Sequence, residues 1–194
     1  VQNGVLTLSP FDNGSNSGTG ASIASATAAP WNSYKSSITE VVVQGGTISM
    51  PTSGSFANAF SGYTALKTAN LANLNASNVA NMSGMFNGCT ALTSFTVMKT
   101  SSTYLSNVSS MFKGCIGLTS LTLTGMQTEK VGTDGFVSMF EGCTNLKSLT
   151  LGNSFKTDNA TSLARMFYEC NALQSAPVAS FNTAKVDSMA AMFF

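Results

Sequence analysis

This chain of 194 residues contains four cysteines and no histidine. The cysteines are the residues whose side chains could do the widest range of chemistry. They recur at intervals of 26 to 28 residues, at Cys89, Cys115, Cys143 and Cys170. A cysteine can ligate a metal, form a disulfide, act as a nucleophile or pack as a small apolar side chain. The spacing has to decide between these four roles.

A regular interval of 26 to 28 residues favours the packing role. A tetrahedral zinc site needs four ligands that converge on one point, usually from C-x2–4-C pairs, whereas one cysteine per repeat forms a row. A disulfide needs Cα atoms about 4.4–6.8 Å apart, closer than we expect for this side of neighbouring repeats. A catalytic thiol needs an activating base or an electropositive pocket. We therefore predict a structural ladder of buried free thiols, with no metal and no cofactor.

Each cysteine belongs to a repeated segment with an aromatic residue at its start. The segments are AFSGYTAL (59–66), MFNGCTAL (85–92), MFKGCIGL (111–118), MFEGCTNL (139–146), MFYECNAL (166–173) and MFF (192–194). Each complete segment leads into an L-x-x-Φ-x-Φ stretch, such as LTSLTL at 118–123, whose alternation predicts a short strand. Repeats of this length are typical of solenoids, in which each unit buries its apolar face against its neighbours.

The other half of each repeat has a different apolar spacing. In the second repeat the apolar positions follow a helical stripe, at Val79, Met82, Met85, Phe86 and Cys89. Candidate N-cap residues precede such stripes at Ser77, Thr157 and Thr183, and a glycine follows the aromatic residue where a helix C-cap favours a left-handed residue. We therefore predict an α/β solenoid resembling leucine-rich repeats, with one short parallel strand and one short helix or turn per repeat. A β-propeller or an all-β helix is the alternative.

Residues 1–58 do not follow this period. Residues 12–30 are of low complexity and predict a loop, and residues 38–50 predict two short strands around a Gly-Gly turn. The open end of a solenoid needs a cover. We predict an N-terminal extension with an irregular β cap over 1–58, in which Trp31 covers the first coil, and about five repeats over 59–194, the last truncated.

Two stretches carry a family resemblance. The segment SNVSSMFKGCIGLTSLTL and the later MFEGCTNLKSLTL resemble the bacterial surface protein repeat of about 26 residues, which is allied to the BspA-like leucine-rich repeats. APWNSYKSSITEVVV is similar to the segment that often precedes such repeats, so the resemblance covers about residues 28–194. It implies a bacterial surface protein that is either secreted or, as a lipoprotein, anchored by lipid. Some members of that family bind host matrix proteins. It brings no catalytic residues with it.

The charge composition argues against several functions. Charged residues make up 9% of the chain and the formal net charge is +1. The sequence contains no basic stripe that would indicate a nucleic-acid partner, so we expect none. The longest aliphatic run, VVV at 41–43, is far too short to span a bilayer. Glu141 and Glu169 fall near the ends of neighbouring repeats, and we expect them to be solvated rather than a glycosidase pair. We therefore expect no enzyme activity.

The outward positions of the predicted strands are the candidate interaction face. Its residues are Asn70, Ser94, Thr96, Ser120, Thr122, Ser148 and Thr150. We expect a non-enzymatic cell-surface or secreted protein for adhesion or protein–protein interaction, whose partner is a host matrix protein or another surface protein. The alternative is a spacer that presents another domain. The apolar Phe193 and Phe194 also predict weak end-to-end self-association.

Overall fold

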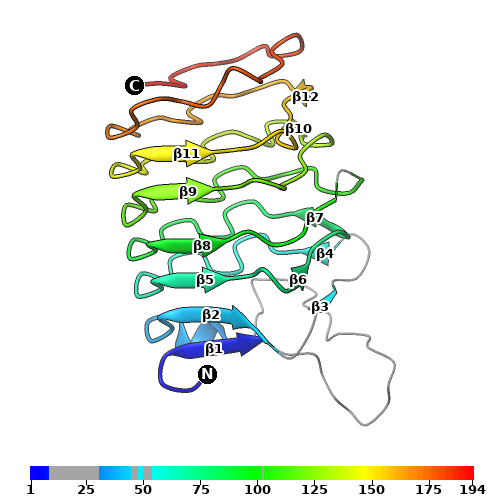
Figure 1. Ribbon diagram of the computed structural model, residues 1–194. Coiled ribbons are helices and arrows are strands. Elements are labelled where there is room, and N and C mark those ends of the chain that lie inside the picture. Colours follow the sequence, from blue (N-terminus) through cyan, green and yellow to red (C-terminus); the bar gives the residue numbers. More distant parts are fainter. Residues whose placement is uncertain (9–30, 45–47, 50–53, 102) are drawn as a thin grey trace.

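The protein is a parallel β-solenoid and not the predicted α/β solenoid. The computed structural model describes residues 1–8, 31–44, 48–49, 54–101 and 103–194, and these contain no α-helix and one short 3-10 helix, η2 (Asn32–Tyr34). The main strands lie one above the other and point the same way (Figure 1). They are β1 (Val5–Leu8), β2 (Glu40–Val43), β5 (Thr68–Asn70), β8 (Ser94–Thr96), β9 (Ser120–Thr122) and β11 (Ser148–Thr150). The first four form one sheet in the order β1-β2-β5-β8, and β9 pairs with β11.

Short parallel pairs form the other sides of the coils. They are β3 (Ile48–Ser49) with β6 (Leu74–Asn75), β4 (Gly54–Ser55) with β7 (Val79–Asn81), and β10 (Gly132–Thr133) with β12 (Asn159–Ala160). The two strands predicted within 38–50 therefore exist as β2 and β3, but they belong to different ladders. The Gly-Gly turn between them and the low-complexity stretch at 12–30 lie outside the described residues.

The segments that were predicted to be helices are series of linked turns. Like a helix, such turns place an apolar side chain inward at about every third residue. Within a coil, the amide of Met85 donates to the carbonyl of Met82 and that of Cys89 to the carbonyl of Phe86, three residues back in each case. Alternate amides donate to the next coil instead, as from Phe86 to Met111 (2.9 Å) and from Gly88 to Lys113 (2.7 Å). An α-helix would satisfy all of them four residues back within one segment.

Left-handed residues at two positions of each coil also exclude a helix. Gly62, Gly88, Gly114 and Gly142 have φ between +70° and +72°, as the sequence predicted, and Glu169 adopts +59° at the same position. The second position, four residues earlier, has φ between +51° and +59° and is mostly not glycine; it holds Asn58, Gly84, Ser110, Ser138, Arg165 and Ala191. Because most residue types at this second position are not glycine, the sequence does not reveal the left-handed backbone there.

The two left-handed positions respond oppositely to substitution. Gly114→Ala is expected to cost about 1–2 kcal/mol from φ alone, because its Cβ would lie 3.7 Å from Cα of Gly88, an ordinary contact. Ser110→Gly is expected to add about 0.5–1 kcal/mol by relieving the strain at φ +54°. Urea denaturation of both variants measures the difference. A destabilising Ser110→Gly would contradict the account.

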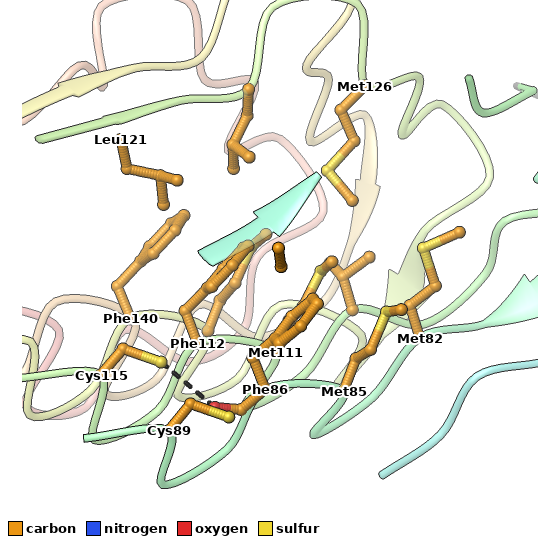
Figure 2. Packing of buried hydrophobic residues seen from close by; sticks show 14 of the residues in the cluster. Met82, Met85, Phe86, Cys89, Met111, Phe112, Cys115, Leu121, Met126 and Phe140 are labelled. Atoms are coloured by element: carbon orange, nitrogen blue, oxygen red, sulfur yellow. Dashed lines mark hydrogen bonds between the residues drawn. The ribbon is translucent and has the colours of Figure 1, made fainter. Parts of the chain in front are cut away.

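Stacked aromatic rings run along the core, one ring per coil (Figure 2). Neighbouring ring centroids are 5.4–6.1 Å apart with interplanar angles of 4–18°, in the column Trp31, Phe60, Phe86, Phe112, Phe140, Phe167 and Phe193. Such offset stacking adds to the free energy of burial. Trp31 starts the column and is itself buried.

The fifth predicted strand, within 173–178, is not formed. Gln174 donates its amide to the carbonyl of Lys147 at 3.4 Å, as the start of a pairing would require, but no ladder follows. Pro177 has no amide hydrogen with which to continue the ladder. The main ladder therefore stops at β11.

Candidate functional site

The outer face of the main ladder carries two columns of polar side chains. In the register of β5 and β8, Thr68 faces Ser94 and Asn70 faces Thr96. In the register of β9 and β11, Ser120 faces Ser148 and Thr122 faces Thr150. The candidate interaction residues are exposed, and they are Asn70, Ser94, Thr96, Ser120, Thr122, Ser148 and Thr150. The inward residues between them, such as Leu121 and Leu149, are buried.

This outer face is chemically uniform. Paired strands are about 4.7–4.9 Å apart, so each hydroxyl has a similar neighbour one coil away. Hydroxyl groups donate and accept hydrogen bonds, and they carry no charge at neutral pH. Phe95 points inward from β8, where its ring packs edge-on against Phe112 with a centroid distance of 5.0 Å. The face can therefore contribute many polar contacts, each of modest strength.

The four cysteines line one corner of successive coils. All four are free and buried. Each Sγ donates a hydrogen bond of 3.0–3.1 Å to the carbonyl of the aromatic residue in the preceding coil, in the pairs Cys89–Phe60, Cys115–Phe86, Cys143–Phe112 and Cys170–Phe140. The bond from Cys115 to Phe86 is drawn in Figure 2. Tyr63 replaces cysteine in the first coil and donates its hydroxyl to Asn32 Oδ1 at 2.7 Å.

Burial keeps these thiols protonated. It raises the pKa of Cys89 to about 12 and that of Cys170 to about 11, and it raises the pKa of Cys115 and Cys143 well above the ordinary range. The reactive form of cysteine is the thiolate. The arrangement therefore holds the sulfur atoms as hydrogen-bond donors and core side chains.

The order of thiol modification tests this geometry. In the folded protein, a thiol reagent is expected to modify Cys170 first, because it is 9% exposed while Cys115 and Cys143 are fully buried. All four should react at the rate of a free thiol in 6 M guanidinium. Mass spectrometry of the modified peptides gives the order. Equal and rapid modification of all four in the folded state would contradict the buried ladder.

A buried carboxylate, Glu141, lies at the end of one coil. Glu141 was expected to be solvated, but it is only 6% exposed. Its Oε1 lies 3.0 Å from Lys113 Nζ and 2.9 Å from Arg165 Nη2, and Arg165 Nε donates to Oε2 at 3.1 Å. Arg165 also lies over the ring of Tyr168, 4.1 Å from its centroid. Glu169, the proposed neighbour of Glu141, is exposed.

The positively charged neighbours of Glu141 keep its carboxylate ionised. Burial raises the pKa of Glu141, but hydrogen bonds from Arg165, Ser138 and Lys113 outweigh burial and lower that pKa to about 2. The cluster ties three consecutive coils together. Opposite charges one repeat apart, at Lys113 and Glu141, were the available sequence signal, whereas Arg165 could be placed only with the turn geometry known.

The described residues show neither a metal-binding cluster nor a membrane-spanning helix. In the described part of the chain, no three His, Cys, Asp or Glu residues are grouped so that they could hold a metal ion. Among the same residues, no helix has the length and apolar character needed to cross a bilayer.

The comparisons with known proteins give one match. A family model described as a Mycoplasma protein of unknown function, DUF285, matches residues 54–148 and again residues 106–194. That family is related to the BspA-like surface repeat proteins. No curated protein and no solved structure matches significantly.

Proposed function

Because the chain belongs to DUF285, the Mycoplasma protein family of unknown function, we propose that it is a non-enzymatic repeat protein that binds other proteins at a cell surface. The observation that carries the proposal is the outer face, where columns of exposed polar side chains, mostly hydroxyls, run over the paired strands β5 and β8 and the paired strands β9 and β11. That the chain is itself BspA-like, and that it is secreted or lies at a surface, belongs to the same proposal.

Binding through such a face would rely on number rather than on single anchors. Hot spots of protein interfaces are enriched in Trp, Tyr and Arg, whereas the candidate face presents hydroxyls and an amide. Each contact is weak, but many copies on one cell would raise the overall affinity through multivalency. Adhesion to host matrix proteins fits this mode.

Positive charges placed on the outer face test this proposal. Thr122→Lys combined with Thr150→Lys should abolish binding to the matrix protein that the wild type recognises in a panel of immobilised matrix proteins. The matched control is Ile116→Lys, an exposed residue at a corner of the coil rather than on a strand. Equal binding by both variants, or no binding of the wild type to any panel member, would refute the proposal.

A spacer is the second candidate, and the ring column favours it. Continuous stacking and intercoil hydrogen bonds make each coil depend on its neighbours, which suits a stiff stalk. Pulling experiments on single molecules distinguish the two. A stalk should extend in coil-sized steps at high force, whatever the state of the outer face.

Self-association at the last coil is a further part of the proposal. Met189 and Phe193 are each more than half exposed, and Phe194 is 85% exposed. Exposed apolar side chains gathered in this way favour association. Light scattering at rising protein concentration should show dimers that Phe193→Ser with Phe194→Ser removes, and a strict monomer at high concentration would contradict this.

A further inference from the structure

The solvent side of the Glu141 cluster carries two cations that share one carboxylate. Lys113 Nζ and Arg165 Nη2 both contact Glu141 Oε1, at 3.0 Å and 2.9 Å, so the two charged groups lie next to each other. The side chain of Glu141 is 8% exposed, whereas those of Lys113 and Arg165 are 41% and 45% exposed. One carboxylate balances only one of the two positive charges, which leaves the exposed side of the cluster positively charged.

Both cations have hydrogen-bond donors that the protein does not use. A guanidinium has five N–H donors, and Arg165 directs two of them, on Nε and Nη2, to Glu141. The ammonium of Lys113 has three N–H donors, and its ion-pair partner is the same Glu141 Oε1. In the described part of the chain, neither cation has a second carboxylate within ion-pair distance. The remaining donors are therefore available to an acceptor that approaches from solvent.

The side chain of Arg165 is held in one place by its neighbours. Its two hydrogen bonds to Glu141 orient the guanidinium, which lies over the ring of Tyr168, 4.1 Å from the centroid. The ring of Phe194 stacks on Tyr168 at 5.7 Å and is 85% exposed. A long side chain that is already ordered loses less conformational entropy on binding. Arginine and tyrosine are also among the residue types that contribute most to protein interfaces.

The charge pattern along the solenoid axis indicates which anions fit. The residue aligned with Lys113 in the preceding coil is Asn87, and the one aligned with Arg165 in the following coil is Ala191. A polyanion gains affinity from many cations in a row, and this cluster offers two. A single carboxylate matches the planar fork of arginine in shape and charge. The exposed carboxylate of Glu169 also lies near enough to Arg165 to act on its charge, and it opposes dense negative charge there.

We propose that Lys113 and Arg165 bind a carboxylate side chain of a partner protein, and that an aromatic residue beside that carboxylate packs on Tyr168 and Phe194. The carboxylate accepts hydrogen bonds from both cations on the side that Glu141 leaves open. The proposal deepens the protein-binding function proposed above, on which the choice of a protein as partner rests. It supplies an arginine and a tyrosine as anchors, residue types that the outer face lacks.

The binding experiment uses the peptide GSDFDSG and the whole isotope-labelled chain. Arg165 is the single arginine of the sequence, so its Nε–H gives one NMR signal of its own. That signal should shift saturably with a Kd of about 0.1–2 mM, and the uncharged peptide GSNFNSG should bind at least about tenfold more weakly. An unshifted signal at about 10 mM peptide, or equal binding of GSNFNSG, would overturn the proposal. A heparin fragment that binds this site more tightly than GSDFDSG would overturn the choice of a protein partner.

Variants of the two cations provide the second arm, measured on the backbone amides of residues 165–169. Lys113→Met keeps the aliphatic stem and removes the charge, so the affinity for GSDFDSG should fall at least about threefold. Arg165→Lys keeps the charge but loses the planar fork, and a similar loss is expected. The matched control is Lys147→Met, an exposed lysine outside the cluster, which should leave the affinity unchanged. Equal losses for Lys147→Met and Lys113→Met would reduce the effect to overall charge and refute the site.

Two further proteins keep the test independent of folding defects and of the outer face. Glu169→Gln changes an exposed side chain and removes the repelling charge beside Arg165, so it should tighten peptide binding about twofold or more. Weaker binding by this variant would contradict the proposal. The protein with Thr122→Lys and Thr150→Lys should bind the peptide no more weakly than the wild type, and a loss there would place the peptide on the outer face and refute the site. Peptide binding at Arg165 without binding to any matrix protein would leave this site standing and reject adhesion alone.

Discussion

Replacing Phe112 with alanine is expected to lower the free energy of unfolding by about 3–5 kcal/mol. The ring is fully buried in the middle of the aromatic column. Its centroid lies 5.8 Å from that of Phe86, 6.1 Å from that of Phe140 and 5.0 Å from that of Phe95. The substitution removes these contacts and leaves a cavity that rigid coils on both sides cannot close.

The position of Phe112 makes the effect more than local. Each coil of a solenoid is stabilised mainly by its neighbours, so a defect at the centre weakens the coupling between the two halves. The urea transition of Phe112→Ala should therefore be broader, with a lower m value, and not only shifted. A lower m value reports loss of two-state behaviour, as expected when the halves unfold separately.

Two variants control for volume and for position. Phe112→Leu keeps an apolar side chain of moderate size and should cost about 1–1.5 kcal/mol. Ile116→Ala changes an exposed residue of the same coil and should stay within about 0.5 kcal/mol of the wild type. If Phe112→Ala cost no more than Ile116→Ala, the column would not be the core of the fold.

Periodicity alone could predict the strands but not the turns. Alternation placed Leu121 inward and Ser120 and Thr122 outward, and the structure has them so. The period of three in the other half of the coil is shared by an α-helix and by linked turns, and the helix predicted from it was wrong. What separates them is the destination of each amide hydrogen, in the same segment or in the next coil, and side-chain patterns do not record it.

The candidate site shows the same limit. The outward hydroxyl columns follow from alternation along a strand, which needs no knowledge of the coil path. The Glu141 cluster depends on which residues of different coils lie side by side. Arg165 reaches Glu141 from a left-handed position at φ +57°, which an arginine rarely adopts. Such contacts become visible only when the register between coils is known.

Acidification should remove the stabilisation that Glu141 provides. The pKa of Glu141 is lowered to about 2 in the folded protein, from an ordinary value of 4.5. A lowered pKa means that the folded state favours the carboxylate, so its contribution is complete above about pH 5 and is lost as the pH falls towards 2. The loss should amount to about 2–3 kcal/mol, which urea denaturation from pH 7 to pH 2 measures.

The variant Glu141→Gln isolates this contribution from the other carboxylates. It should be less stable than the wild type by about 2–3 kcal/mol at pH 7, and the difference should become small near pH 2, where the wild-type carboxyl is half protonated in the folded state and almost fully protonated in the unfolded state. Thr144→Ala, in the same coil but outside the ion pairs, should shift stability by a constant amount over this range. A constant difference for Glu141→Gln as well would mean that the carboxylate stabilises the coils through its shape and not its charge. Because Lys113 and Arg165 lie in the flanking coils, the charge account also predicts that neutralising Glu141 loosens three coils together rather than one.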